Sequence, residues 1–508
     1  MNNCINKKIN TKYLVIIIFL IISTALSAQK IKKIKILNAD KFTYSKELEI
    51  DARRLIGDVA FQHEDTYLYC DSAYLYIKTN NIDAFGNIHI KASDSLDIYG
   101  DTLNYDGNTK IAKLKNNVRL IDNQINLSTD NMIYDLNNNI GSYFSGGKII
   151  DENNILTSKI GHYYSDNKEF FFKDSVVLIN PEYIMNSDTL KYNTITEISY
   201  FYGPSTITSD DNFIYCENGW YNTISDISQY NKNAYLRNDE QTLSGDSLYY
   251  DRNLGFGKAF FNVVMIDTVQ NIILKGQFAE YMEETGNSLI TDSSVAIIVD
   301  EKDSLFLHAD TLKMLFDSAK AGKTLFAYYK VKFFKQNLQG MCDSLVYDFK
   351  DSLIKLIEKP LIWSDKNQLS AEYIELRLSD NKIKTMLLQK SAFLVEQDDS
   401  TQFNQIKGKE MTGYFNDNKL KKVLVQGNSE SVYFVRDENK FLIGVNKSVS
   451  SNLTIYLKNN EIHSILYLTE PIATLTPLKE LSKNELILKG FFWEIEKRPK
   501  NKFDIFRW

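Results

Sequence analysis

Residues 99–108 read YGDTLNYDGN, and residues 244–253 read SGDSLYYDRN. Both stretches place a leucine two residues, and a tyrosine four residues, after an acidic residue. Side chains two residues apart share one face of a β-strand, so the leucine and the tyrosine of each copy point the same way. A hairpin needs such a phrase only once. Its return much later in the chain predicts a fold built by stacking copies of one unit.

Further copies of the phrase follow one another at a nearly constant spacing. Five successive intervals between Asp101 and Asp246 are each 29 residues long, and the intervals lengthen toward the end of the chain. Most copies keep an aromatic residue four positions after the anchor, and the remaining ones have leucine or methionine there. The anchors are Asp40, Asp71, Asp101, Asp130, Lys159, Asp188, Glu217, Asp246, Gln277, Asp310, Asp343, Glu372, Glu410 and Asn452.

Each unit also has a second half, a short apolar run led by small, polar or basic residues, such as NNVRL at 116–120 and DSVVL at 174–178. Turn-forming residues such as Asp106-Gly107-Asn108 separate the two halves. Alternation with a period of two indicates strands, and Asp-Gly or Asn-rich turns directly after a strand indicate hairpins. The sequence therefore predicts an all-β, elongated stack of about fourteen ~29-residue antiparallel hairpin repeats, with one strand of each unit in each of two facing sheets.

Other all-β stacks fit the repeat less well. Propeller blades need about 40–50 residues, which is longer than this unit. A parallel β-helix can accommodate the period, but it has no need of a tight turn after every anchor aromatic. The turns therefore favour the antiparallel stack, which we assign to residues 29–465 as one body.

The first 28 residues have the pattern of a cleaved signal peptide. Three lysines precede an apolar run of ten residues at 13–22, YLVIIIFLII, and the small residues of STALSA follow it. This run is shorter than the ~20 residues that a membrane-spanning helix needs, although a retained signal anchor is the alternative. Removing three lysines changes the formal charge from −6 to −9. The signal peptide predicts an exported protein. Because an acidic chain has no general attraction to nucleic acid, we also expect no nucleic-acid partner.

The signal peptide, the repeated apolar–x–acid–x–Leu–x–Tyr phrase and the second-half pattern together resemble the OstA/LptA-like periplasmic proteins of lipopolysaccharide transport. The resemblance implies a V-shaped, twisted β-jelly roll whose apolar groove carries lipopolysaccharide or a related lipid toward the outer membrane. It also implies inner- and outer-membrane transport components as partners, and end-to-end self-association. The chain departs from the family in its many repeats. Only about forty residues follow the last repeat, too few for the large C-terminal barrel of the family's outer-membrane member.

If the interior is a lipid groove, the inward-facing residues of both halves should line it, because acyl chains need walls without unpaired polar atoms. A closed core filled by the same residues is the alternative. The predicted groove residues are Leu103, Tyr105, Val118, Leu120, Met132, Tyr134, Val176, Leu178, Leu190, Tyr192, Leu248, Tyr250, Val263, Met265, Leu345 and Tyr347.

The polar residues indicate neither catalysis nor a cofactor. The anchor acids could suggest a calcium ladder, but calcium needs six or more oxygen ligands, and one acid per unit is better explained as a rim residue that bonds turn or backbone groups. The five histidines have no metal-ligand spacing, and no nucleophile elbow or phosphate loop occurs. We expect no catalytic residues, metal or cofactor. The alternative function is a secreted β-helical protein that binds or cleaves polysaccharide.

Three cysteines test the stack. Cys70, Cys216 and Cys342 each directly precede an anchor. They therefore occupy one equivalent position, several repeats apart, which is beyond the ~7 Å between Cα atoms that a disulfide allows. We predict three free thiols.

Residues 466–508 break the pattern with three prolines and a mixture of aromatic and basic residues. An elongated stack needs its open end covered, so we favour a capping role for this tail. Docking to a partner or to a membrane surface is the alternative.

Overall fold

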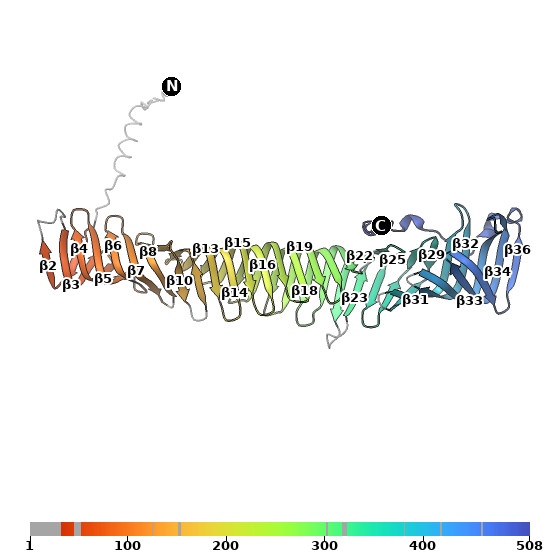
Figure 1. Cartoon of the computed structure of the whole chain (residues 1–508), viewed down its shortest axis with the longest axis horizontal. Helices are drawn as coiled ribbons and strands as arrows, with labels where there is room; N and C mark the ends of the chain where they lie inside the picture. Colours follow the sequence, from red (N-terminus) through yellow and green to blue (C-terminus); the bar gives the residue numbers. More distant parts are fainter. Residues whose placement is uncertain are drawn as a thin grey trace, which may run out of the picture. The chain divides into compact units, whose positions relative to one another are not determined.

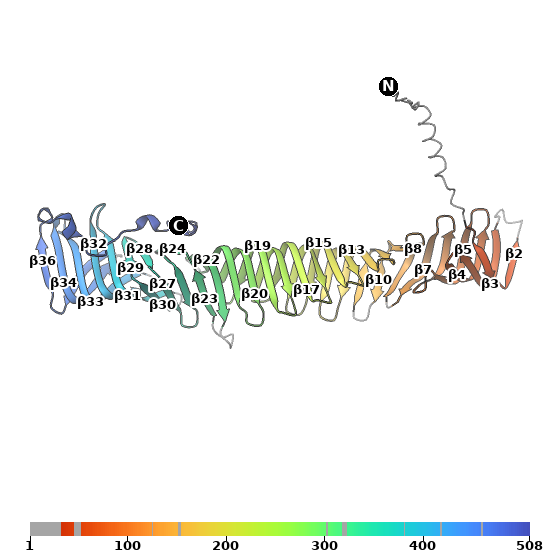
Figure 2. The ribbon, with the colours of Figure 1, turned by 180° about the vertical axis from the view of Figure 1, so that it is seen from behind.

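The computed structural model describes residues 32–44, 52–123, 125–150, 154–300, 303–316, 323–379, 382–416, 419–458 and 461–508. The predicted signal peptide, residues 1–28, lies outside these ranges. The chain divides into two compact units, one ending at Pro181 and one running from Glu182 to Trp508. In both units the strands follow one another in chain order (Figures 1 and 2).

Thirteen strands of the first unit lie within the described residues. They are β1 (Lys35–Asn38), β2 (Lys41–Tyr44), β3 (Ala52–His63), β4 (Thr66–Tyr76), β5 (Asn81–Lys91), β6 (Leu96–Asp106), β7 (Ile111–Asp122), β8 (Ile125–Asp135), β9 (Ile140–Tyr143), β10 (Gly147–Ile150), β11 (Ile155–Ser158), β12 (Ile160–Tyr164) and β13 (Glu169–Ile179).

The second unit continues the pattern and ends in four short 3₁₀ turns. Its elements are β14 (Ile184–Asn193), β15 (Ile198–Thr208), β16 (Phe213–Asn222), β17 (Ile227–Arg237), β18 (Gln241–Asp251), β19 (Phe256–Asp267), β20 (Ile272–Met282), β21 (Ser288–Ile298), β22 (Leu305–Phe316), β23 (Lys323–Tyr328), β24 (Val331–Lys335), β25 (Leu338–Cys342), β26 (Ser344–Asp348), β27 (Leu353–Ile357), β28 (Leu361–Ser364), β29 (Asn367–Ser370), β30 (Tyr373–Ser379), β31 (Lys382–Gln397), β32 (Phe403–Asn416), β33 (Lys419–Arg436), β34 (Leu442–Lys458), β35 (Glu461–Leu468), β36 (Ile472–Thr476), η1 (Leu478–Glu480), η2 (Lys483–Leu486), η3 (Ile495–Lys497) and η4 (Asp504–Phe506).

The strand pairings found among the described residues are antiparallel, as in β6 with β7 and β15 with β16. The predicted all-β stack of antiparallel hairpins is therefore confirmed. The same pairings contradict the parallel coils of the alternative β-helix, in which neighbouring strands would run in the same direction. The strands continue to Thr476, beyond residue 465 where the spacing had placed the end of the stack.

Each long strand bends near its middle, at a point that we call the corner. In β6, Ile98 and Gly100 are buried before the corner, and Leu103 and Tyr105 are buried after it. The buried set thus changes from even to odd numbers where the register with β7 shifts, between Tyr99 and Thr102. Such a bulge turns the strand, so that both halves direct their side chains into one interior.

The two halves of the strands form two walls. We call the wall that carries residues such as Tyr105 the tyrosine wall, and the wall on the other side of the corner the facing wall. The sequence had placed one strand of each unit in each sheet. Instead both strands of a repeat bend at the corner, as β6 and β7 do. Each such repeat therefore contributes two segments to each wall.

The anchor acids hold the corners. In β7 the corner consists of Asn116 and Asn117, with φ of 60° and 51°, in the left-handed region that asparagine and glycine tolerate best. The amide of Asn117 donates a hydrogen bond of 2.6 Å to Oδ2 of Asp101 on the neighbouring strand. Asn87 makes the equivalent 2.9 Å bond to Asp71. The sequence had placed these acids at the rim, bonding turn or backbone groups. The structure instead places them at the corner, where each accepts a hydrogen bond from a side-chain amide.

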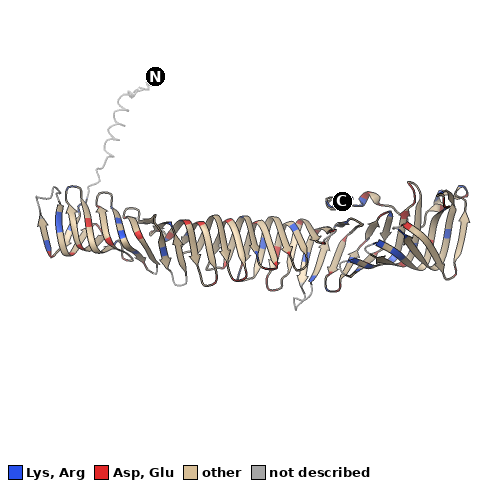
Figure 3. Ribbon diagram, viewed as in Figure 1, with Lys and Arg blue, Asp and Glu red and all other residues tan. Residues whose placement is uncertain are grey.

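The same corner contact recurs in other repeats, in one case with a different pair of residue types. The pairs Asn233–Glu217 and Asn262–Asp246 repeat the amide–carboxylate bond. At another corner the charges are exchanged, because Lys159 is the anchor and Asp174 is the corner residue, with 3.0 Å between Nζ and Oδ2. A polar contact is therefore retained across the corner when the residue types change, and both signs of charge are scattered along both units (Figure 3).

The residue after the tyrosine closes the hairpin. Oδ1 of Asp106 accepts hydrogen bonds from the backbone N–H of Asn108 (2.8 Å) and of Thr109 (3.2 Å). Asp135 caps the next such turn through the N–H of Asn137 at 2.8 Å. This side-chain turn is a common use of aspartate and asparagine, and it explains why the phrase ends in an acid.

We predict that one corner can be broken and partly rescued. A Cβ added to Gly86 (φ 75°) would lie 2.3 Å from Oδ2 of Asp71, so Gly86→Ala should cost about 2–3 kcal/mol of local stability through the clash and the left-handed backbone. The double variant Asp71→Ala/Gly86→Ala should cost less than the sum of the single variants. The measurement is amide hydrogen exchange in β4 and β5. Gly146→Ala is the control, because its φ is also positive but no atom lies within 4 Å of the added Cβ. Additive costs would contradict the contact.

The three predicted free thiols are confirmed: Cys70, Cys216 and Cys342 are unpaired and buried. Burial raises the pKa of Cys216 to about 11 and that of Cys70 to about 12.

Because only the thiolate reacts, roughly a thousandth or less of each of these two thiols is reactive at pH 8. We expect a chain carrying Cys4→Ser to react negligibly with a thiol reagent when native, and to show three reactive thiols in denaturant. Rapid reaction of any native thiol would contradict the buried positions.

Candidate functional site

Apolar side chains run in an unbroken row along the facing wall of the second unit. Neighbouring strands pair these residues directly, so that each contacts the next across the sheet. The row consists of Met185, Ile207, Ile214, Leu236, Leu243, Met265, Leu274, Ala296 and Leu307. Those from Ile207 to Met265 are only partly buried, although residues nearer the corner, such as Ala234 and Val263, are almost inaccessible. The interior is therefore open on the side away from the corner.

The tyrosine wall of the same unit has a matching row in which tyrosines alternate with small residues. The order across the strands is Tyr192, Ser199, Tyr221, Ser228, Tyr250, Gly257, Tyr281 and Ser288. The small residue on each neighbouring strand leaves room for a ring to lie over it. These four tyrosines are partly exposed.

Two of these tyrosines use their hydroxyls on their own wall. Tyr221 donates a 2.6 Å hydrogen bond to Asp226, in the hairpin turn that follows its strand. Tyr250 donates to Glu283 in a neighbouring turn. Burial first, and then the acceptor carboxylate, raise the pKa of both phenols. Because these hydroxyls are bonded at the open edge of the wall, the faces of the rings remain available as apolar surface.

In the first unit, by contrast, equivalent tyrosines connect the two walls. The hydroxyl of Tyr105 lies 2.5 Å from Nδ1 of His63, at the far end of the facing wall. Tyr163 donates a 2.6 Å bond to Asp122, which occupies the same position two repeats later. Lys168 also contacts Asp122, with 2.5 Å between Nζ and Oδ2. These cross-wall contacts, which we call bolts, close the side away from the corner.

The bolted interior is packed. Leu120, Tyr134 and Tyr163 are at most 1% exposed, and the cavity lined by His63 and Tyr105 measures about 10 Å³. That volume holds roughly one water molecule. The interior of the first unit is therefore packed along these bolts.

One bolt recurs in the second unit, and beyond it lies an apolar cavity. Lys323 contacts Asp267, which is the positional equivalent of Asp122. Nearer β14 the walls are joined by Arg252 and Glu182, both more than half exposed, at 2.9 Å. The cavity, of about 70 Å³, is lined from both walls. Its apolar lining residues are Ile298, Val299, Leu305, Leu307, Phe333, Leu338, Leu345, Tyr347, Ile354, Leu376, Leu378 and Ile383.

The sixteen predicted groove residues fall into two sets. The first unit holds eight of them, of which seven are buried and Leu178 is partly exposed: Leu103, Tyr105, Val118, Leu120, Met132, Tyr134, Val176 and Leu178. In the second unit Tyr192, Tyr250 and Met265 lie at the open side, Leu190, Leu248 and Val263 lie near the corner, and Leu345 and Tyr347 line the cavity.

The apolar interior gives way to a polar one in the last repeats, which sequence reasoning missed. Glu396 is 5% exposed and accepts hydrogen bonds from Asn404 (2.8 Å) and from the backbone N–H of Ile462 (2.7 Å). Burial raises the pKa of this carboxyl. Ser431 lies within 3.0 Å of the hydroxyl of Tyr467. The signal was present as serines and asparagines at the inward positions of residues 429–450.

Residues 477–508, which we call the strap, lie along the outer side of the second unit, from β34 back to β22 (Figures 1 and 2). Its apolar side chains, including Leu488 and Trp493, pack on Phe393, Val432 and Val445. The open end of the stack is therefore not the main surface that these residues cover.

Buried glutamines on successive repeats form hydrogen bonds with the main chain of the strap. Gln405 donates to the carbonyl of Leu486 and accepts from the N–H of Leu488, both at 2.8 Å. Gln368 makes the same two contacts with Phe492 and Glu494, at 3.0 and 2.8 Å. Each glutamine thus pairs with an extended segment as a strand would.

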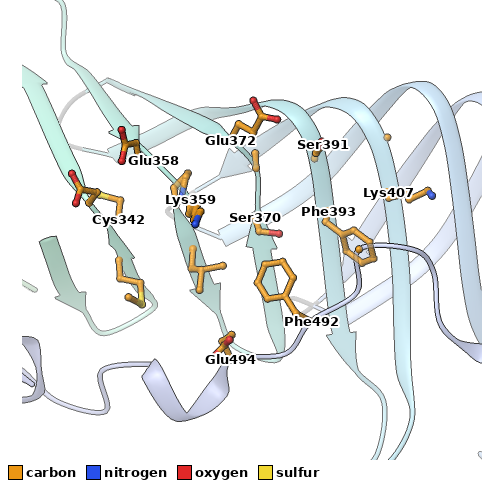
Figure 4. Close-up of a pocket in the computed structure, with 18 of the residues that line it drawn as sticks. Cys342, Glu358, Lys359, Ser370, Glu372, Ser391, Phe393, Lys407, Phe492 and Glu494 are labelled. Atoms are coloured by element: carbon orange, nitrogen blue, oxygen red, sulfur yellow. The ribbon is translucent and has the colours of Figure 1, made fainter. Parts of the chain in front are cut away.

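A cavity of about 1170 Å³ lies between the strap and the corners of the last repeats. Figure 4 shows Glu358 and Lys359 between β27 and β28, Glu372 between β29 and β30, and Phe492 and Glu494 on the strap. Acids and lysines both line it, so it has no strong preference for one sign of charge.

Across the ranges that the structure covers, no group of three or more His, Cys, Asp or Glu residues is arranged to hold a metal ion. Within those same ranges, no helix has the length and apolarity to cross a membrane.

The fold defines a repeat protein of bent antiparallel hairpins whose two walls enclose one interior. Residues 31–188 and 184–246 match the family model described as OstA-like protein. This stretch, somewhat less than half of the chain, is OstA-like, and the resemblance inferred from the repeat is confirmed.

Solved structures resemble the chain only weakly. LptH of Pseudomonas aeruginosa, described as the LptA-homologous periplasmic component of the lipopolysaccharide transport device, is 10% identical, and the match covers 28% of this chain and 96% of that one with a TM-score of 0.22. An ancestral GH74 enzyme is 7% identical, with 86% and 93% covered and a TM-score of 0.11. At these scores neither supports an argument about function. No curated protein matches the chain.

The glutamine contacts predict separable effects on the strap. Gln405→Leu removes both of its hydrogen bonds to the strap, each worth about 1 kcal/mol, and should speed amide exchange at Leu488 while leaving Glu494 slow. Gln368→Leu is the matched control and should show the reverse pattern. Exchange measured by NMR or mass spectrometry that stays unchanged in both variants would contradict the contacts.

Proposed function

We propose that the protein is a non-enzymatic lipid carrier whose second unit holds acyl chains between its walls. The observation that carries this proposal is the pair of partly exposed apolar rows, Ile207 to Met265 on one wall and the tyrosines on the other. An interior that is apolar and yet open to one side is costly in water unless something covers it. Acyl chains do so, at about 0.8 kcal/mol per buried CH₂ group.

The size of the cavity indicates how lipid would enter. At about 70 Å³ it is well below the ~300–1,000 Å³ of most ligand sites. We therefore infer that the walls separate at the open side when a chain enters. The buried bolts of the first unit and the Lys323–Asp267 bolt oppose such a movement. Nearer β14, the exposed Arg252–Glu182 pair opposes it little, because exposed ion pairs contribute about 0–1 kcal/mol.

The lipid and its route follow from the resemblance to the OstA-like family. We infer that the chain is exported by its N-terminal segment, works in the periplasm, and carries lipopolysaccharide or a related lipid toward the outer membrane. Membrane components of that pathway would contact its ends, and copies could also join end to end. The polar core around Glu396 supports a limit to this path, because hydroxyls and a carboxylate disfavour acyl chains.

Site-specific photo-crosslinking tests the proposal. A benzophenone amino acid at Met265, Leu236 or Leu345 should capture lipopolysaccharide in cells. The matched control is Leu120, which occupies the position of Leu236 and Met265 within the bolted first unit and should capture at least tenfold less than Leu236, the site farther from the Lys323–Asp267 bolt. Val264, the outward neighbour of Met265, should capture none.

Equal capture at Leu120 and Leu236 would show that the bolts do not close the first unit. Capture at Val264 without capture at Met265 would contradict the lipid path itself. A fully closed spacer would give no capture at any of these positions, which would also refute the proposal.

A further inference from the structure

The end of the strap combines positive charge with exposed aromatic rings. Residues 497–508 read KRPKNKFDIFRW and contain five Lys or Arg residues against one aspartate, a net charge of +4 in a chain of net charge −6. Phe503 is 67% exposed, Trp508 57% and Phe506 44%. We call residues 497–508 the knob.

The knob is held in place, so these rings are not exposed by fraying. Ile505 anchors it in the unit at 1% exposed. Oδ2 of Asp504 accepts bonds from the backbone N–H of Lys500 and from the amide of Asn501, each at 3.0 Å. The indole N–H of Trp508 donates to the carbonyl of Lys330 at 3.0 Å.

Three of the five cations of the knob, Lys500, Lys502 and Arg507, remain accessible, whereas Arg498 bonds Gln339 and Lys497 pairs with Glu494. Nζ of Lys502 is 5.3 Å from the centre of the Phe503 ring and 5.4 Å from that of Phe306. The side chain of Arg507 is 83% exposed although it lies 3.4 Å from Asp504. Lys500 has no ion-pair partner among the described carboxylates. Cation and ring therefore present a joint surface to solvent.

Single exposed apolar residues are ordinary on protein surfaces, and Ile487 elsewhere in the strap is 52% exposed. The knob differs because three exposed rings lie within six residues of one another, among lysines and arginines. Trp and Phe rings flanked by Lys and Arg suit the headgroup layer of a bilayer, where the ring is partly desolvated and the cation meets a phosphate.

We propose that the knob docks the protein on the surface of an anionic phospholipid bilayer. Twelve residues offer less area than the ~800 Å² per partner of a standard protein interface. Charge favours an anionic surface, since each Lys or Arg near such a membrane contributes favourably and the chain elsewhere is acidic. The proposal goes beyond lipid carriage, because it concerns a surface separate from the interior.

Co-sedimentation of the full chain with vesicles tests the docking. Binding should be strong to phosphatidylglycerol-containing vesicles, weak to pure phosphatidylcholine, and reduced by salt. Lys500→Glu/Lys502→Glu should lower the partition coefficient at least ~10-fold, and Phe503→Ser/Trp508→Ser should lower it to a similar extent. Lys419→Glu/Lys421→Glu, an equal charge change at exposed positions in β33, should leave it within about twofold.

Variants with unchanged circular dichroism and unchanged lipid capture at Met265 separate this surface from the lipid path. Vesicle binding that is equal in the wild type, the knob variants and the control variant would overturn the proposal. Binding of an acidic protein by the knob without any vesicle binding would overturn it as well.

Discussion

The corner contact is the constraint on which the remaining structure depends. A carboxylate such as that of Asp101 bonds a left-handed corner residue on the next strand, here Asn117. Without the bend, alternate residues of a strand would face opposite sides, and half of the apolar residues would be left in water. The bend changes the parity, so both halves face one interior. The same contact joins the two strands of a repeat, as in Asp71–Asn87 and Asp246–Asn262, which lets the stack grow by one rule.

The walls of both units are built in the same way. What the interior holds therefore depends on which side chains connect the two walls at the side away from the corner. In the first unit Tyr105 and Tyr163 reach across to His63 and Asp122, and the core around them is packed. In the second unit Tyr221 turns to Asp226 on its own wall. One side-chain position therefore serves either as a bolt or as part of the rim, according to the partner available.

The strap adds a third layer of organisation. Its backbone is recognised by Gln368 and Gln405 through pairs of hydrogen bonds, while its apolar side chains cover the outer face of the last repeats. Those repeats have the polar interior around Glu396. Apolar residues such as Phe393 and Val432 lie on their outer face, and the strap gives them the burial that the interior does not provide.

The repeat phrase determined the class of fold, the anchors and the unpaired cysteines, because strand periodicity and turn chemistry are local. It also identified the inward residues, since parity follows from position. Whether Tyr105 or Tyr250 faces a packed core or an opening was decided only by the tertiary structure, because that depends on partners 40 or more residues away, such as His63. The path of the strap was decided in the same way, by glutamines far from it in sequence.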